Sequence, residues 1–323
     1  MVTIVESPKD FTPVGEGLVF VAQSDVKSDF VVDIIDAKTD EVVGSKYIAG
    51  VERAVIDIAP YVEVQGVAEL SELRNWSLKS LPTRSYYITV ETADGGAVSE
   101  AVRVSSNLKA PIVNTLQTAM PMVRSIGYGE DDDLRVAVLY GAPVRVEART
   151  NLGERRTIEL TSCEGFAQLH LTTADLGKRT QAVVVEFYVG NQAVAQVEYR
   201  IVPRYNGAVR VGWVGPTGAV EHYTFPITVS KSVVSERTKL YMQRVEGDIV
   251  SNKSYKRLTL RSQALSEDMA EVLATILTAP KVWIEGEEIV GAQLSDSQVV
   301  TKSFNKAAVV EITLEYGGKE VVL

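Results

Sequence analysis

Few side chains of this chain are of the types that usually carry out catalysis. Its 323 residues include two histidines, His170 and His222, and one cysteine, Cys163. These are too few to build a zinc site from three histidines or from paired cysteines in one chain. A lone histidine on a strand is more often a surface or core residue than a catalytic base. We therefore predict no catalytic, cofactor-binding or metal-ligating residue.

Cys163 is also a poor candidate for a nucleophile. It lies at an expected junction of strand and turn, and the sequence has no Gly-x-Ser-x-Gly motif that would offer a serine instead. We interpret Cys163 as a buried or incidental thiol. A pair of Cys163 with His170 is disfavoured but stays open, because a sequence does not show spatial neighbours. One cysteine cannot form an internal disulfide, which suits a reducing cytosol.

An acidic run is the sharpest candidate for a metal site. It consists of Glu130, Asp131, Asp132 and Asp133. Hard cations such as calcium bind several carboxylate oxygens, but consecutive aspartates lack the alternating spacing and the central glycine of a calcium loop. We favour a solvated turn that leads into the strand beginning at Leu134. Whether the run binds a cation stays open.

Two glycine-containing segments do not fit known phosphate loops. A Walker loop around Gly177-Lys178 would need glycine where Thr172 stands, and serine or threonine where Arg179 stands. The segment Gly127-Tyr128-Gly129 precedes the acidic run, whose carboxylates would repel a pyrophosphate. We therefore expect no bound cofactor.

The tryptophans bear on carbohydrate binding, which uses exposed aromatic rings. Trp213 and Trp283 alternate with apolar residues in strand-like segments, so we predict that they belong to the core. Trp76 lies in a polar stretch and is predicted to be exposed or to plug the end of a sandwich. A hydrolase would need a perturbed pair of acids in a deep cleft, and 42 acidic residues single out no such pair.

Composition and charge limit the possible functions. Hydrophobic residues make up 46% of the chain and charged residues 23%, so we expect a folded, soluble protein. The formal charge is 33 − 42 = −9, which disfavours binding to nucleic acid, because that binding needs lysine and arginine. We expect no membrane span and see no secretory signal, although a signal could have been removed.

Most of the sequence alternates between apolar and polar residues, which predicts half-buried strands. Polar and glycine-containing clusters follow about every ten residues, as in antiparallel sandwiches. Residues 86–104 and 183–201 each predict a hairpin of two long strands, and this weak repeat favours two tandem sandwiches. The predicted fold is mainly β, with two antiparallel β-sandwich domains followed by an α+β domain.

Boundaries are predicted where the composition changes. The N-terminal β-sandwich is assigned to residues 1–107, the second β-sandwich to 108–203 and the C-terminal α+β domain to 204–323. Linker-like residues surround the first boundary, and Pro203 lies at the second.

The last domain should contain a hairpin and one helix. A hairpin is predicted over residues 208–225 around Gly215-Pro216-Thr217-Gly218. Ser266 can cap a helix that Pro280 ends. Its predicted apolar stripe comprises Met269, Val272, Leu273, Ile276 and Leu277. The sheet beneath it is expected from residues 239–245, 255–262, 281–284, 298–302 and 307–316.

Several segments resemble structural proteins of tailed bacteriophages and of prophages from gut anaerobic bacteria. The resemblance extends over residues 19–316, and the family usually has asparagine where Gly215 stands. The similar segments are Ile58-Ala59-Pro60-Tyr61, Arg124-Ser125-Ile126 before the acidic run, Trp213-Val214-Gly215-Pro216-Thr217-Gly218 before Tyr223-Thr224-Phe225, Leu258-Thr259-Leu260-Arg261-Ser262, and Pro280-Lys281-Val282-Trp283-Ile284. The resemblance implies a virion component and no catalytic residues.

We therefore expect a non-enzymatic virion structural protein of the tail, connector ring or distal tail, assembled in the host cytoplasm. It would act through self-assembly or through docking to other virion proteins, because β-rich modules offer sheet edges that a neighbour can complete. An acidic exterior would also let DNA pass without binding. The alternative is a carbohydrate-binding or fimbrial β-sandwich protein at a cell surface.

Overall fold

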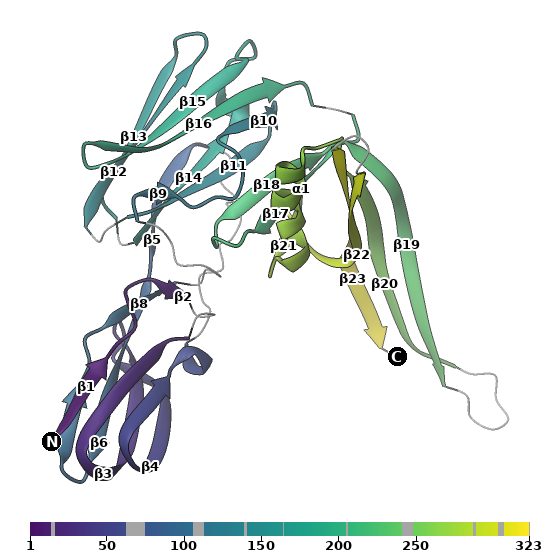
Figure 1. Cartoon of the computed structure of the whole chain (residues 1–323). Helices are drawn as coiled ribbons and strands as arrows, with labels where there is room; N and C mark the ends of the chain where they lie inside the picture. Colours follow the sequence, from purple (N-terminus) through teal and green to yellow (C-terminus); the bar gives the residue numbers. More distant parts are fainter. Residues whose placement is uncertain are drawn as a thin grey trace.

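The computed structural model shows a chain made mainly of β-strands, which confirms the predicted mainly β class (Figure 1). The structure describes residues 1–13, 17–62, 75–105, 113–138, 141–163, 165–204, 206–240, 248–286, 289–302 and 307–322. Within these ranges, no helix has both the length and the apolar character needed to cross a bilayer.

The N-terminal sheet contains seven strands. They are β1 (Val2–Glu6), β2 (Thr12–Pro13), β3 (Val19–Asp36), β4 (Glu41–Asp57), β6 (Arg84–Thr92), β7 (Gly95–Val98) and β8 (Val102–Ser105). One half of the long strand β3 pairs with β1 and the other half with β6, while β4 follows β3 along most of its length. The sheet therefore curls around a core that includes Phe20, Phe30 and Tyr86. A short 3₁₀ helix, Ala59–Tyr61, follows β4.

Two further sheets, called here the paired sheets, share a second core. One contains β5 (Ser77–Pro82), β14 (Gly165–Thr172), β11 (Asp131–Ala137) and β9 (Thr115–Leu116), in that order. The other contains β10 (Val123–Gly127), β16 (Gln192–Val202), β15 (Ala182–Val189), β12 (Ala142–Thr150) and β13 (Arg155–Cys163). Apolar side chains of both sheets, such as Leu169 and Phe187, meet between them. The hairpin predicted over residues 183–201 is confirmed as β15 and β16.

Two strand pairings in the paired sheets were not expected from the sequence. β10 lies parallel to β16, so the sandwich is not wholly antiparallel. β5 precedes residue 107 in the chain but pairs with β14 of the paired sheets. Strand pairing thus crosses the position at which we predicted the first domain boundary.

The C-terminal sheet has seven strands and carries the helix on one face (Figure 1). Its order is β18 (Val220–Phe225), β17 (Val209–Val214), β21 (Val282–Glu285), β22 (Val290–Lys302), β23 (Ala307–Val322), β20 (Asp248–Arg261) and β19 (Ile227–Leu240). The hairpin predicted over 208–225 is confirmed as β17 and β18. The strand predicted over 239–245 falls largely outside the described residues, and β20, β22 and β23 are longer than predicted.

Helix α1 (Glu267–Ala274) begins where the sequence predicts. The side chain of Ser266 accepts a hydrogen bond from the backbone N–H of Met269 at 3.3 Å, which caps the first turn. Leu273 and Ile276 are fully buried against the sheet. After Ala274 the helix tightens into a 3₁₀ turn, Thr275–Thr278, and Leu277 of the predicted stripe is 38% exposed. The tighter turn changes the angle between successive side chains and rotates Leu277 away from the sheet.

A stack of aromatic and guanidinium groups connects the three sheet systems. Phe11, next to the N-terminal sheet, lies edge-on to Phe166 of β14, with ring centroids 5.9 Å apart. Arg103 of β8 covers Phe11, and Arg135 of β11 lies 3.6 Å from the Phe166 centroid. Arg135 then donates a hydrogen bond to the carbonyl of Gly218, in the turn between β17 and β18, at 2.9 Å.

Candidate functional site

The acidic run does not form the solvated turn that we expected. Glu130, Asp132 and Asp133 are each at most 4% exposed, and the three aspartates begin strand β11. That interpretation was wrong because the polar face of β11 packs against the C-terminal sheet instead of water. The carboxylates there contact basic side chains of four strands, β10, β14, β17 and β18. We call this group the ionic joint; it comprises Glu130, Asp132, Asp133, His170, Arg210, His222 and Glu285.

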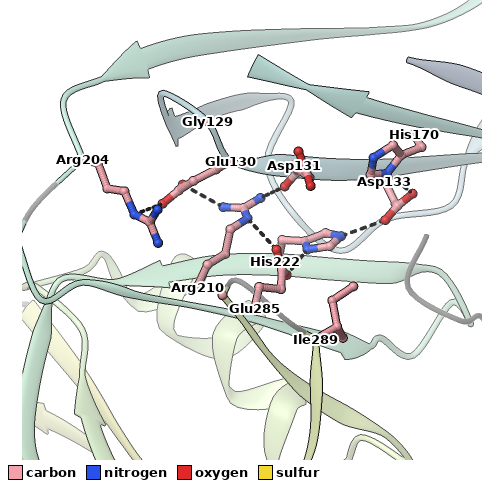
Figure 2. A pocket seen from close by; sticks show the side chains of 11 residues that line it. Gly129, Glu130, Asp131, Asp133, His170, Arg204, Arg210, His222, Glu285 and Ile289 are labelled. Atoms are coloured by element: carbon pink, nitrogen blue, oxygen red, sulfur yellow. Dashed lines mark hydrogen bonds and ion pairs between the residues drawn. The ribbon is translucent and has the colours of Figure 1, made fainter. Parts of the chain in front are cut away.

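Arg210 of β17 occupies the centre of the ionic joint (Figure 2). Its side chain is 5% exposed, and its guanidinium contacts three carboxylates: Glu130 Oε2 (3.3 Å), Asp132 Oδ1 (3.5 Å) and Glu285 Oε2 (3.4 Å). A buried arginine is stable only when such partners replace its water shell. Burial alone would lower the pKa of Arg210, but these carboxylates raise it. Arg210 therefore remains charged and joins the paired sheets to the C-terminal sheet.

His222 of β18 contacts a carboxylate of the paired sheets and a carboxylate of the C-terminal sheet. Its Nδ1 lies 2.7 Å from Glu285 Oε1, and its Nε2 lies 3.2 Å from Asp133 Oδ2. Both ring nitrogens can donate only when the imidazole is protonated. Burial would lower the pKa of His222, but Glu285 and the aspartates raise it to about 10. His222 is thus an imidazolium at neutral pH.

The second histidine binds the same aspartate. His170 lies directly opposite Asp133 on the neighbouring strand β14, with Nδ1 3.2 Å from Asp133 Oδ1. Burial would raise the pKa of Asp133, but hydrogen bonds from His170 and His222 hold it well below its usual range. Both histidines are buried, and each also contacts a carboxylate of the ionic joint.

A second set of polar contacts flanks the ionic joint. Arg124 of β10 lies 2.9 Å from Asp132 Oδ2, and the hydroxyl of Tyr199 donates to the same oxygen at 2.6 Å. Glu221 of β18 accepts hydrogen bonds from Thr118 and from the backbone N–H of Ala119, both at 2.8 Å. Burial raises the pKa of Glu221 and outweighs the charge of Arg124. The contacts of Glu221 reach from the segment before β10 to the C-terminal sheet, whereas those of Arg124 and Tyr199 lie within the paired sheets.

A cavity of about 90 Å³ lies beside the ionic joint (Figure 2). Asp131, His170 and Arg204 are among the residues that line it. Burial raises the pKa of Asp131. In the described part of the chain, no group of three or more His, Cys, Asp or Glu side chains has an arrangement that could hold a metal ion.

The other predicted residues lie apart from the ionic joint. Cys163 is fully buried in the core of the paired sheets, and its sulfur accepts a hydrogen bond from Ser80 at 3.6 Å, while His170 contacts Asp133. Lys178 lies in a surface turn after β14, as expected for a basic turn.

The tryptophans differ in burial. Trp213 is fully buried, whereas Trp283 is only partly buried, so its assignment to the core was correct only in part. Trp76 is 9% exposed and donates from Nε1 to the carbonyl of Thr172 at 2.8 Å. It packs into the core of the paired sheets, which agrees with the prediction of a plug.

Neither the protein-family models nor the curated proteins contain a match to this chain.

From the sequence, we did not identify five of these residues as parts of a site. They are Arg124, Tyr199, Arg210, Glu221 and Glu285. Arg210 lies between apolar residues of a strand, which suggests a solvent-facing position in a half-buried sheet. The strands β11, β17 and β18 are buried on both faces, so this rule fails for them. The one feature of the sequence that could have suggested these contacts is complementary charge. Residues 130–133 are acidic, whereas residues 210 and 222 are basic.

Proposed function

We propose that this chain is a non-enzymatic virion structural protein, a tail, connector-ring or distal-tail component that acts by self-assembly or docking. The proposal includes three tandem domains, 1–107, 108–203 and 204–323, in which β5 of the first pairs with β14 of the second. The observation that carries it is the presence of two long edge strands. Within the described residues, the 17-residue strand β4 pairs only with β3, and the 14-residue strand β19 pairs only with β20.

Free edges of this length support assembly. Each presents a row of backbone N–H and C=O groups that a strand of a neighbour can satisfy. Both strands also carry exposed apolar side chains: Val55 of β4 is 60% exposed, and Val233 of β19 is 74% exposed. Apolar and β-branched side chains stabilise cross-strand pairs between subunits as they do within a sheet.

The ionic joint supports the same function. Its charged groups contact one another across two sheet systems, which holds the C-terminal sheet, with its edge strand β19, at a fixed angle to the paired sheets. Regular assemblies need such preorganised subunits, because every repeat must present the same geometry. The ionic joint therefore has a structural role in this proposal. The assignment to a virion rests on the sequence resemblance.

The tryptophan best placed in the sequence for a sugar platform, Trp76, is buried. This observation does not favour the carbohydrate-binding alternative.

Assembly can be tested with the purified full chain. We expect light scattering after size exclusion to show oligomers, and negative-stain images to show rings or tubes. Val55→Asp and Val233→Asp should each reduce assembly, whereas Leu152→Asp, at a 52% exposed position in the turn between β12 and β13, should not. A monomer at every concentration, with no response to these variants, contradicts self-assembly.

The virion assignment needs a separate measurement. An antibody raised against the chain should label particles purified from a lysed culture of the host that encodes it. Particles without label, and without peptides of the chain in their mass spectra, contradict the assignment.

A further inference from the structure

A groove of about 650 Å³ runs between the paired sheets and the C-terminal sheet, next to the ionic joint. This volume lies within the range of protein binding pockets, which often form where two structural bodies meet. All five residues of β10 line the groove. Side chains of a strand alternate between two faces, so a contact with five consecutive residues means that the groove follows the backbone edge of β10.

That edge of β10 is open over part of its length. β10 ends its sheet and pairs only with β16 among the described strands. The carbonyl of Met122 accepts from Glu198, and the N–H of Tyr128 donates to Val202, so even-numbered residues face β16. Backbone groups alternate in direction along a strand, and those of Val123, Ser125 and Gly127 therefore face the groove.

Protein groups already bind the outward-facing atoms at one end of β10. Gly127 donates its N–H to Glu130 and accepts from Thr173. Val123 is 46% exposed, Ser125 is also exposed, and β10 has no second partner strand among the described residues. Two successive outward-facing residues are thus available for a short added strand.

The opposite wall of the groove is apolar and adaptable. Met269 and Val272 of helix α1 face it, together with Leu265, and all three are only partly buried. Methionine fits many shapes because its side chain is unbranched and polarizable. These side chains can accept an apolar residue of a bound segment.

The lining of the groove includes an exposed cation. Arg204 lines the groove, its side chain is 51% exposed, and its ion pair with Glu130 Oε1 spans 4.0 Å. Glu130 also binds Gly127, which places Arg204 near that end of β10. An acidic side chain on a bound segment would match Arg204 in charge.

We propose that the groove binds an extended segment of a partner protein that adds as a strand to the free edge of β10. The segment places an apolar side chain against Met269 and Val272 and an acidic side chain at Arg204. This inference rests on the proposed function, because it names a site at which an assembly partner docks. Main-chain hydrogen bonds give the affinity, and the two side chains give the selectivity.

The test uses a displayed library of random nine-residue peptides as the probe. Peptides are selected on the full chain after depletion on Ser125→Trp, which fills the groove at an exposed position. We expect selected peptides with apolar residues at alternate positions and one Asp or Glu. If no peptide distinguishes the full chain from Ser125→Trp, the proposal is wrong.

Selected peptides are then measured by fluorescence anisotropy. Arg204→Glu should weaken binding by about tenfold, because an attraction becomes a repulsion. The matched control Arg200→Glu alters an exposed arginine of β16 that does not line the groove, and binding should not change. Methylating the peptide amides one at a time should weaken binding at every second position. Equal effects at all positions, or none, contradict strand addition.

The outcomes also separate this inference from the proposed function. If the chain assembles but the library yields no groove-dependent peptide, the docking groove is wrong and assembly stands. If peptides bind as expected while the chain stays monomeric and is absent from particles, the docking groove is supported and the proposed function is wrong. Calorimetric binding of dodecanoate, with no selected peptide, assigns the groove to a small amphiphile and overturns strand addition.

Discussion

The charge on His222 should make the stability of the protein fall as the pH rises. The imidazolium faces Asp132 and Asp133 on β11 and Glu285 on β21, with Arg210 on β17 and His170 on β14 nearby. Its pKa is raised from 6.5 to about 10, so the protein holds this proton more tightly when folded. The stabilisation is therefore complete below about pH 6.5 and is lost as the pH rises toward 10.

The magnitude follows from the two pKa values of His222. Between them, the folded protein binds one more proton than the unfolded chain. The free energy of unfolding then falls by about 1.4 kcal/mol per pH unit, or about 5 kcal/mol over the whole interval. Asp133 behaves in the opposite sense: its pKa is lowered, so its stabilisation is present above about pH 4 and is lost in acid.

Urea unfolding followed by tryptophan fluorescence measures this effect. Other groups titrate near pH 10, so the informative quantity is the difference in unfolding free energy between the native chain and His222→Gln. We expect this difference to be largest at pH 6 and to shrink steadily toward pH 10. Because the chain has only two histidines, NMR of the imidazole protons can follow each one directly. A constant difference, or a His222 resonance that titrates near pH 6.5, refutes the reasoning.

Three substitutions test other parts of the fold by urea unfolding. Arg210→Met leaves the buried carboxylates of the ionic joint without their central cation and should cost about 3–5 kcal/mol, whereas Arg200→Met at an exposed site should change stability by less than about 0.5 kcal/mol. Phe11→Ala removes a ring that is 4% exposed and packs on Phe166; we expect a loss of about 3 kcal/mol and faster proteolysis after residue 11. Ser266→Ala removes the N-cap of α1 and should cost about 1 kcal/mol. An effect of Arg210→Met no larger than that of its control contradicts the ionic joint.

Local features of the fold could be predicted from the sequence. Alternating side chains identify strands, and glycine-containing turns mark hairpins, because both depend on residues close together in the chain. This is why the hairpins β15–β16 and β17–β18 and the start of α1 at Ser266 were predicted correctly. The parallel pairing of β10 with β16 joins segments about 75 residues apart, and no local pattern encodes it.

The ionic joint could not be predicted for a related reason. Polar side chains on one face of a strand normally indicate water on that face, and Asp133 in its acidic run fits this rule. The rule fails because His222, 89 residues further along the chain, covers that face. A sequence shows the charge on each face of a strand, but it does not show which other surface packs against that face. Acidic and basic strand faces in one chain could have suggested the pairing only as one possibility among several.

Two of the contacts that join the sheet systems differ in kind and should respond differently to pH. The N-terminal sheet meets the paired sheets through the rings of Phe11 and Phe166, which do not titrate. The paired sheets meet the C-terminal sheet through His222 and Arg210, and His222 loses its proton near pH 10. Small-angle scattering between pH 7 and pH 10 should therefore show movement of the C-terminal sheet alone. The change should be smaller in His222→Gln, whose joint lacks the titrating group. An equal change in both proteins means that the ionic joint does not fix this angle.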